Sequence, residues 1–125
     1  MIVGLGIDLL ENGRMERELS RGDWLRDDGI FTPEEITDCS ATRGPALRFA
    51  ACFAAKEAVC KALRVQVSDL AMFREAEIRI GRNGQNQVVL HERLKTESER
   101  LGVRGIHLSF VHHAAQTCAL VILEA

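Results

Sequence analysis

The stretch PALRFAACFAAKEAVCKALR, residues 45–64, decides the fold that we expect for this chain. It opens on Pro45, and proline is favoured at the first position of a helix because its fixed φ suits the helix and its missing N–H is not needed there. Alanine and larger apolar residues give it a nearly continuous apolar face, which is typical of a helix that is largely buried. The stretch therefore predicts one long helix packed closely on a sheet.

Strands and shorter helices are predicted on both sides of this helix. Residues 2–9 alternate between apolar side chains and glycine or aspartate, which indicates a strand. Asn83-Gly84 is a strong hairpin dipeptide between strands at 74–80 and 86–90. Further helices are predicted at residues 11–20, from Thr32-Pro33 onward and at 91–101, and the last strands at 105–111 and 117–124. This order indicates a single α+β domain over residues 1–125, with an antiparallel sheet that carries helices on one side.

The charge of the chain argues against a generic nucleic-acid binder. With 16 basic and 18 acidic residues the formal net charge is −2, whereas such binders show a basic excess. Basic residues nevertheless gather in the middle of the chain, opposed there only by Glu57; they are Arg43, Arg48, Lys56, Lys61 and Arg64. This group indicates either a solvated helix face or a site for a phosphate-bearing small molecule or an acidic protein.

The cysteines and the apolar segments predict a cytoplasmic protein without a membrane partner. None of the four cysteines has CxxC spacing, so we interpret them as reduced core residues. The first residues lack the basic segment of a signal peptide, and no apolar run approaches the ~20 residues of a membrane span.

The segment GLGIDL, residues 4–9, places Asp8 on the same strand face as Gly4 and Gly6. A dinucleotide fingerprint would need a third glycine where Leu9 stands, so that interpretation fails. Two others remain open. Asp8 either caps the turn at residues 11–13 or faces a ligand, with the glycines leaving room for another backbone or for that ligand.

Two further segments carry groups that can do chemistry. On the long helix, Phe53, Glu57 and Lys61 share one stripe, and Glu57 and Lys61 have the spacing of a favourable ion pair. The pair is either an ordinary surface pair or, given the alanines around it, a partly buried site. In HLSFVHH, His107 and Ser109 share a strand face, and the absence of HxxxH spacing on a helix disfavours zinc.

Together the segments GxGID…E, FAAKEAxxKAL and HLSxxH before ALVILE resemble the holo-acyl-carrier-protein synthases, the small single-repeat class of 4′-phosphopantetheinyl transferases. The resemblance spans nearly the whole chain. It implies transfer of 4′-phosphopantetheine from coenzyme A to a serine of an apo acyl carrier protein, with 3′,5′-ADP as the second product. It also implies a homotrimer with active sites at the subunit interfaces.

The resemblance implies roles for individual residues. Asp8 and Glu57 would hold Mg²⁺, with Glu57 as the base for the serine and Lys61 at the leaving phosphate. The coenzyme A ligands would be Arg48, Lys56, Lys61, His107 and Ser109, and Arg14 and Arg17 would dock the acidic carrier protein.

The chain departs from the family pattern at Cys52, where an arginine is common, at the loop 64–67, which lacks the usual glycine, and at Val111. These departures suggest a specialised paralogue. They also leave two alternatives open: a non-catalytic relative that binds a carrier protein or nucleotide, and a different metal-dependent phosphate-ester enzyme.

Overall fold

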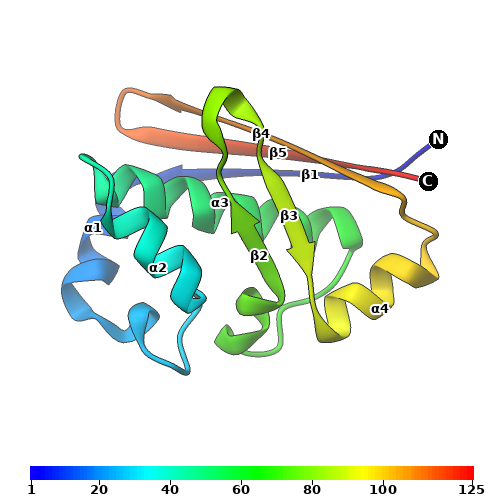
Figure 1. Cartoon of the computed structure of the whole chain (residues 1–125), viewed down its shortest axis with the longest axis horizontal. Helices are drawn as coiled ribbons and strands as arrows, with labels where there is room; N and C mark the ends of the chain where they lie inside the picture. The colour runs from blue at the N-terminus through cyan, green and yellow to red at the C-terminus, as the bar shows by residue number, and fades with distance from the viewer.

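Helix α3 (Pro45–Leu63) runs along one face of a three-stranded antiparallel sheet whose strand order is β1-β5-β4 (Figure 1). The computed structural model describes residues 1–125. Before α3 come β1 (Ile2–Glu11), α1 (Asn12–Arg21) and α2 (Pro33–Ser40). After it come β2 (Ala76–Arg79), β3 (Gln87–Leu90), α4 (Glu92–Arg100), β4 (Gly105–His113) and β5 (Gln116–Glu124). Three short 3-10 turns complete the chain: η1 (Asp23–Leu25), η2 (Leu70–Glu75) and η3 (Arg82–Gly84). The predicted α+β order is confirmed.

The two glycines of β1 let the strand lie directly on α3. A Cβ at Gly6 would stand 1.9 Å from the Ala58 carbonyl oxygen, and one at Gly4 would stand 2.4 Å from the Ala62 carbonyl oxygen. The predicted close approach of another backbone is therefore confirmed, and that backbone is the one of α3. The next residue on the same strand face is Asp8, which lies beside α3 for this reason.

The helices begin and end where their end signals predict. Thr32 caps α2 in a capping box: its hydroxyl accepts from the Glu35 N–H, and the Glu35 carboxylate accepts from the Thr32 N–H. Helix α3 ends at Leu63, and the capping residue Arg64 takes the left-handed conformation with φ 58°.

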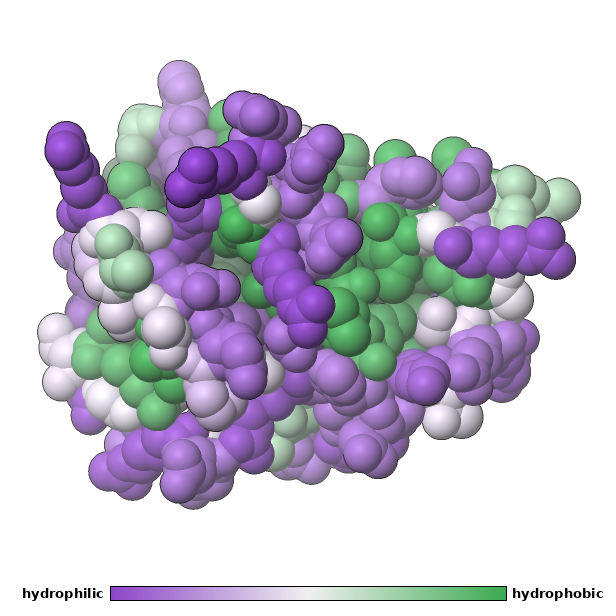
Figure 2. Space-filling model, viewed as in Figure 1, coloured by the Kyte–Doolittle hydropathy of each residue, from purple (hydrophilic) through white to green (hydrophobic).

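The hairpin β2–β3 forms a separate two-stranded sheet, whereas the sequence predicted a single antiparallel sheet. The Ile78 N–H on β2 donates to the Glu35 carboxylate of α2 over 2.7 Å. The Glu35 side chain thus takes a backbone N–H of β2 that would otherwise be available to a neighbouring strand. In Figure 1 the hairpin crosses in front of α3, and Figure 2 shows hydrophobic side chains gathered beside it on a mostly hydrophilic face.

The face of the large sheet that points away from α3 is apolar and exposed. On β1 the side chains of Leu5, Ile7 and Leu9 are 62%, 58% and 61% exposed. Their neighbours across the sheet on β5 are Ile122, Leu120 and Cys118. An apolar strand face of this extent is unusual for the surface of a monomer.

The cysteines and the apolar segments were singled out in the sequence. All four cysteines are free, and Cys39, Cys52 and Cys60 are buried. No helix combines the length and the apolar character needed to cross a membrane.

Candidate active site

Asp8 and Lys61 form a contact between β1 and α3. The Lys61 ammonium donates to Asp8 Oδ1 over 2.9 Å and to the Ile7 carbonyl oxygen over 3.1 Å. The Asp8 side chain is 14% exposed and that of Lys61 52%. At the start of α1, the Asn12 N–H donates to the Ala115 carbonyl oxygen and no side chain caps the helix. Asp8 is therefore not a helix cap, its carboxylate is paired with Lys61, and its role toward a ligand stays a prediction.

Glu57 lies half-buried on the same side of α3. Burial, followed by the negative charge of Asp8, raises the pKa of the Glu57 carboxyl, while Lys61 and Arg14 act in the opposite direction. The expected ion pair between Glu57 and Lys61 is replaced by the pair of Lys61 with Asp8. The ammonium is drawn to β1 because the Ile7 carbonyl and the Asp8 carboxylate both accept from it there. Glu57 is thus left without a hydrogen-bonded cation.

Arg14 of α1 lies at the edge of this group. Its guanidinium carbon is 5.8 Å from the centroid of the Trp24 ring and 5.7 Å from that of Phe53. Arg17 is exposed on the same helix. The sequence pointed to both arginines but not to Trp24, because η1 is too short for any periodic pattern.

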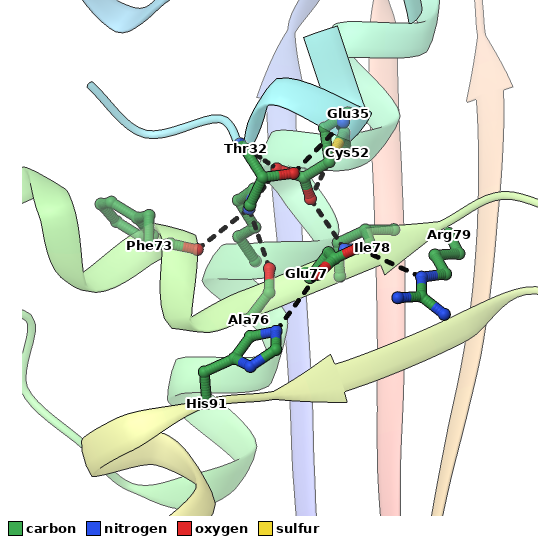
Figure 3. Close-up of polar contacts among 10 residues, drawn as sticks. Thr32, Glu35, Cys52, Phe73, Ala76, Glu77, Ile78, Arg79 and His91 are labelled. Carbon is green, nitrogen blue, oxygen red and sulfur yellow. Dashed lines mark hydrogen bonds and ion pairs between the residues drawn. The ribbon is translucent and has the colours of Figure 1, made fainter. Parts of the chain in front are cut away.

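Lys56, expected among the coenzyme A ligands, lies elsewhere. Its side chain is fully buried, with its ammonium 2.8 Å from the Glu35 carboxylate, 2.9 Å from the Phe73 carbonyl oxygen and 2.8 Å from the Ala76 carbonyl oxygen. Figure 3 shows these acceptors converging between α2, η2 and β2. All three protons of the ammonium are therefore used inside the core, and we exclude Lys56 from the candidate ligands. The basic residues of α3 consequently do not form one surface patch.

Cys52, at the position where the sequence resemblance implied an arginine, belongs to the same buried cluster. Its thiol donates to Glu35 Oε2 over 3.3 Å and is 1% exposed. Burial is the main cause that raises the pKa of this thiol well above its usual value. Cys52 is thus a neutral core residue that does not reach a ligand.

Arg48, one turn earlier on α3, lines a cavity of about 410 Å³ together with Phe110 and His112. The His112 Nδ1 is 2.6 Å from the Thr117 hydroxyl, which itself donates to Asn12 Oδ1 over 2.6 Å. Because the hydroxyl has only one proton, His112 donates from Nδ1 and keeps Nε2 as an acceptor. Burial and then the charge of Arg48 lower the pKa of His112, which favours this neutral form. The sequence left the role of His112 open, since the Asn12 that orients its partner Thr117 is distant in the chain.

His107 and Ser109 lie on the opposite face of the sheet from α3. Their strand neighbours Ile106, Leu108 and Phe110 pack against the core, so the alternation of β4 turns His107 and Ser109 outward. His107 is 3.3 Å from the Glu124 carboxylate at this surface. Within one chain, these two residues are therefore not brought together with Asp8, Glu57 and Lys61.

The donor set fits a magnesium ion that arrives with a phosphate ligand. No group of three or more histidine, cysteine, aspartate or glutamate side chains is arranged to hold a metal. Asp8 and Glu57 supply two carboxylates whose mutual repulsion raises the Glu57 pKa, after burial. Mg²⁺ typically takes one or two carboxylates and completes its shell with phosphates and waters. Asp8 and Glu57 thus fit a Mg²⁺ ion whose other ligands come from the substrate phosphates and from water. They do not fit a metal ion that is bound by protein side chains alone.

The chain is similar to proteins of one family over nearly its full length. Residues 4–119 match the family model described as the 4′-phosphopantetheinyl transferase superfamily. A holo-[acyl-carrier-protein] synthase of Geobacter sp. (strain M21) is 35% identical over 124 residues, which cover 99% of both chains.

Solved structures of holo-[acyl-carrier-protein] synthases share the fold. The crystal structure of the enzyme from Neisseria meningitidis has a TM-score of 0.85 and 28% identity, with 100% of both chains covered. That from Bacillus anthracis, in complex with CoA (3′,5′-ADP), has a TM-score of 0.77 and 28% identity, covering 100% of this chain and 98% of the other. With the acid–lysine group at the contact of β1 and α3, these likenesses show that the chain belongs to the 4′-phosphopantetheinyl transferase superfamily, among the holo-[acyl-carrier-protein] synthases.

Proposed function

We propose that this chain is a holo-acyl-carrier-protein synthase, which transfers 4′-phosphopantetheine from coenzyme A to a serine of an apo acyl carrier protein. The observation that carries the proposal is the convergence of Asp8, Glu57 and Lys61 where β1 meets α3. The relatives' names describe this activity, and one similar structure contains CoA (3′,5′-ADP). The free cysteines and the absence of a membrane-spanning helix support a cytoplasmic location.

In the proposed reaction the serine oxygen bonds to the phosphorus next to pantetheine while the bridging P–O bond to 3′,5′-ADP breaks. Asp8 and Glu57 would hold Mg²⁺, which offsets the charge of the pyrophosphate and polarises the phosphorus. Glu57 would accept the serine proton, directly or through a metal-bound water. Lys61, already held over Asp8, stabilises the charge that develops on the departing phosphate.

We also propose a homotrimer whose active sites lie between subunits. The exposed apolar face that includes Leu5, Ile7 and Leu9 supports burial against further copies. His107 and Ser109 lie on that same outer side of the sheet and would reach coenzyme A on a neighbouring subunit. Arg48 remains a proposed coenzyme A ligand from α3, and Arg14 and Arg17 remain proposed docking residues for the carrier protein.

Mass spectrometry tests the transfer directly. Purified protein with coenzyme A, Mg²⁺ and an apo carrier protein is expected to add the mass of one phosphopantetheine to the carrier. Asp8→Ala and Glu57→Ala are expected to abolish the gain while circular dichroism shows an intact fold. No gain with any of several carrier proteins would refute the proposal.

A non-catalytic relative is the second candidate, because Cys52 is buried where the family has an arginine. Calorimetry with coenzyme A separates the two candidates. Binding that needs Mg²⁺ and weakens in Arg48→Ala supports the transferase, with Arg48 replacing the absent arginine. No Mg²⁺-dependent binding favours the non-catalytic relative.

A further inference from the structure

Trp24, the only tryptophan of the chain, lies beside Arg14 at the edge of the candidate active site. The rings of Trp24 and Phe53 touch, with centroids 4.7 Å apart, and we call this ring pair the aromatic shelf. The Arg14 guanidinium is 5.8 Å from one centroid and 5.7 Å from the other. Both distances fall within the range of about 6 Å at which a cation is attracted to a ring face.

Both rings of the aromatic shelf are fixed by contacts with neighbouring residues. The Trp24 carbonyl accepts from the Ile30 N–H over 3.1 Å, and Gly29 lies so close that a Cβ there would stand 2.3 Å from the same carbonyl oxygen. Only 8% of Trp24 is exposed. Phe53 is fixed in α3 and packs edge-on against Phe73, with centroids 5.5 Å apart. Neither ring can move far without disturbing the core.

The position of Phe53 determines where Arg14 is held. Phe53 and Glu57 are four residues apart on α3, so the two side chains lie on one helix face, one turn from each other. The guanidinium, 5.7 Å from the Phe53 centroid, accordingly lies beside the face of α3 that carries Glu57.

The hydrogen-bonding edge of Arg14 is free. Arg14 is exposed and has no hydrogen bond or ion pair in the structure, whereas Arg93 and Arg100 are both paired with carboxylates. Stacking uses the face of the guanidinium plane and leaves the N–H groups at its rim available for a carboxylate. Arg14 is thus oriented by the rings without being neutralised.

We infer that Trp24 and Phe53 are positioning residues: the aromatic shelf holds Arg14 beside Glu57 with its N–H edge free for a carboxylate of the acidic carrier protein. This inference rests on the proposed transfer reaction. A side chain that is already oriented loses less freedom when the partner binds, so the aromatic shelf strengthens carrier binding near the reacting serine.

Steady-state kinetics tests the inference by separating the two substrates. Trp24→Leu is expected to raise KM for the carrier protein about fivefold, the size of one cation–ring contact, and to leave KM for coenzyme A unchanged. Trp24→Phe keeps a ring and is expected to stay near the wild type. Phe31→Leu, which removes an aromatic side chain from the same core away from Arg14, is the control for lost packing. In Arg14→Ala, Trp24→Leu is expected to have no further effect.

Fluorescence provides a test that needs neither turnover nor a destabilising variant. Because Trp24 is the sole tryptophan, its emission reports on the aromatic shelf alone. Arg14→Ala is expected to change the emission of the free protein, and the apo carrier protein is expected to change it in the wild type but not in Arg14→Ala.

The outcomes distinguish the inference from the proposed function. A folded Trp24→Leu whose KM for the carrier rises no more than that of Phe31→Leu overturns the inference while the transferase stands. If the wild type transfers nothing, the proposed function fails. Emission that is unchanged in Arg14→Ala overturns the contact of Arg14 with the aromatic shelf in either case.

Discussion

At the scale of single residues, Glu57 combines a proposed function with a cost in stability. Burial and the neighbouring Asp8 raise the pKa of its carboxyl, so its ionised form is disfavoured in the folded chain. Lys61 offsets this charge only in part, because its ammonium is hydrogen-bonded to Asp8. Groups whose charged form is destabilised in this way are typical of sites that bind a cation or accept a proton.

Glu57→Gln is therefore expected to lower activity and raise stability together. Its amide neither holds Mg²⁺ nor accepts the serine proton, so transfer should fall by at least about 10²-fold. Because the pKa of Glu57 is higher in the folded than in the unfolded chain, ionisation of Glu57 lowers the free energy of unfolding once the pH is above both values. The amide in Glu57→Gln cannot ionise, so the variant avoids this loss at pH 7. Because the side chain is half exposed, we expect a rise in melting temperature of only about 1–3 °C by calorimetry. A lower melting temperature would contradict this account of Glu57.

Gly6 shows how a residue without a side chain positions the site. In Gly6→Ala the new Cβ would lie 1.9 Å from the Ala58 carbonyl oxygen, a backbone atom that cannot move aside. We expect a loss of about 3 kcal/mol or more in the free energy of unfolding, measured with urea. The control is Gly13→Ala on α1, where the nearest atom is a flexible Arg17 nitrogen at 3.4 Å, and we expect no loss there. A tolerated Gly6→Ala would mean that β1 does not lie directly on α3.

At the scale of elements, the sequence predicted the strands and helices well because their signals are local. The alternation of β1, the capping residues of α2 and the Asn83-Gly84 turn each depend on a few neighbouring residues. The environments of Lys56 and Lys61 could not be predicted in this way. Both are lysines of one helix, and only the partners from distant elements decide that one enters the core and the other meets β1.

The buried pair of Lys56 with Glu35 joins α3 to α2, η2 and β2. Removing one partner of a buried ion pair leaves the other charge without compensation, so Lys56→Met is expected to lower the free energy of unfolding by about 3–5 kcal/mol. Lys95→Met on the surface of α4 should change it by less than about 0.5 kcal/mol. Below its melting temperature, Lys56→Met should keep the wild-type KM for coenzyme A. A large rise of that KM in the folded variant would restore Lys56 as a ligand.

At the scale of the whole molecule, one chain does not contain the complete proposed site. Asp8, Glu57 and Lys61 lie on the α3 side of the sheet, and His107 and Ser109 lie on the other. The outer side is also the apolar one, and a symmetric assembly would bury it. The proposed trimer, in which neighbouring subunits would share each site, accounts for both the exposed apolar surface and the divided polar residues.

Mixed assemblies test this sharing. Glu57→Gln and His107→Ala are each expected to be weakly active alone, because every site in either assembly lacks one group. When the two variants are co-expressed with different tags and purified as mixed trimers, every trimer contains both kinds of subunit. A site that takes Glu57 from one subunit and His107 from its neighbour is then intact at one of the three interfaces, about a third of the sites. Transfer should therefore return to about a third of the wild-type rate per site. If both residues served a site within one chain, every chain would remain defective, and mixing would restore nothing.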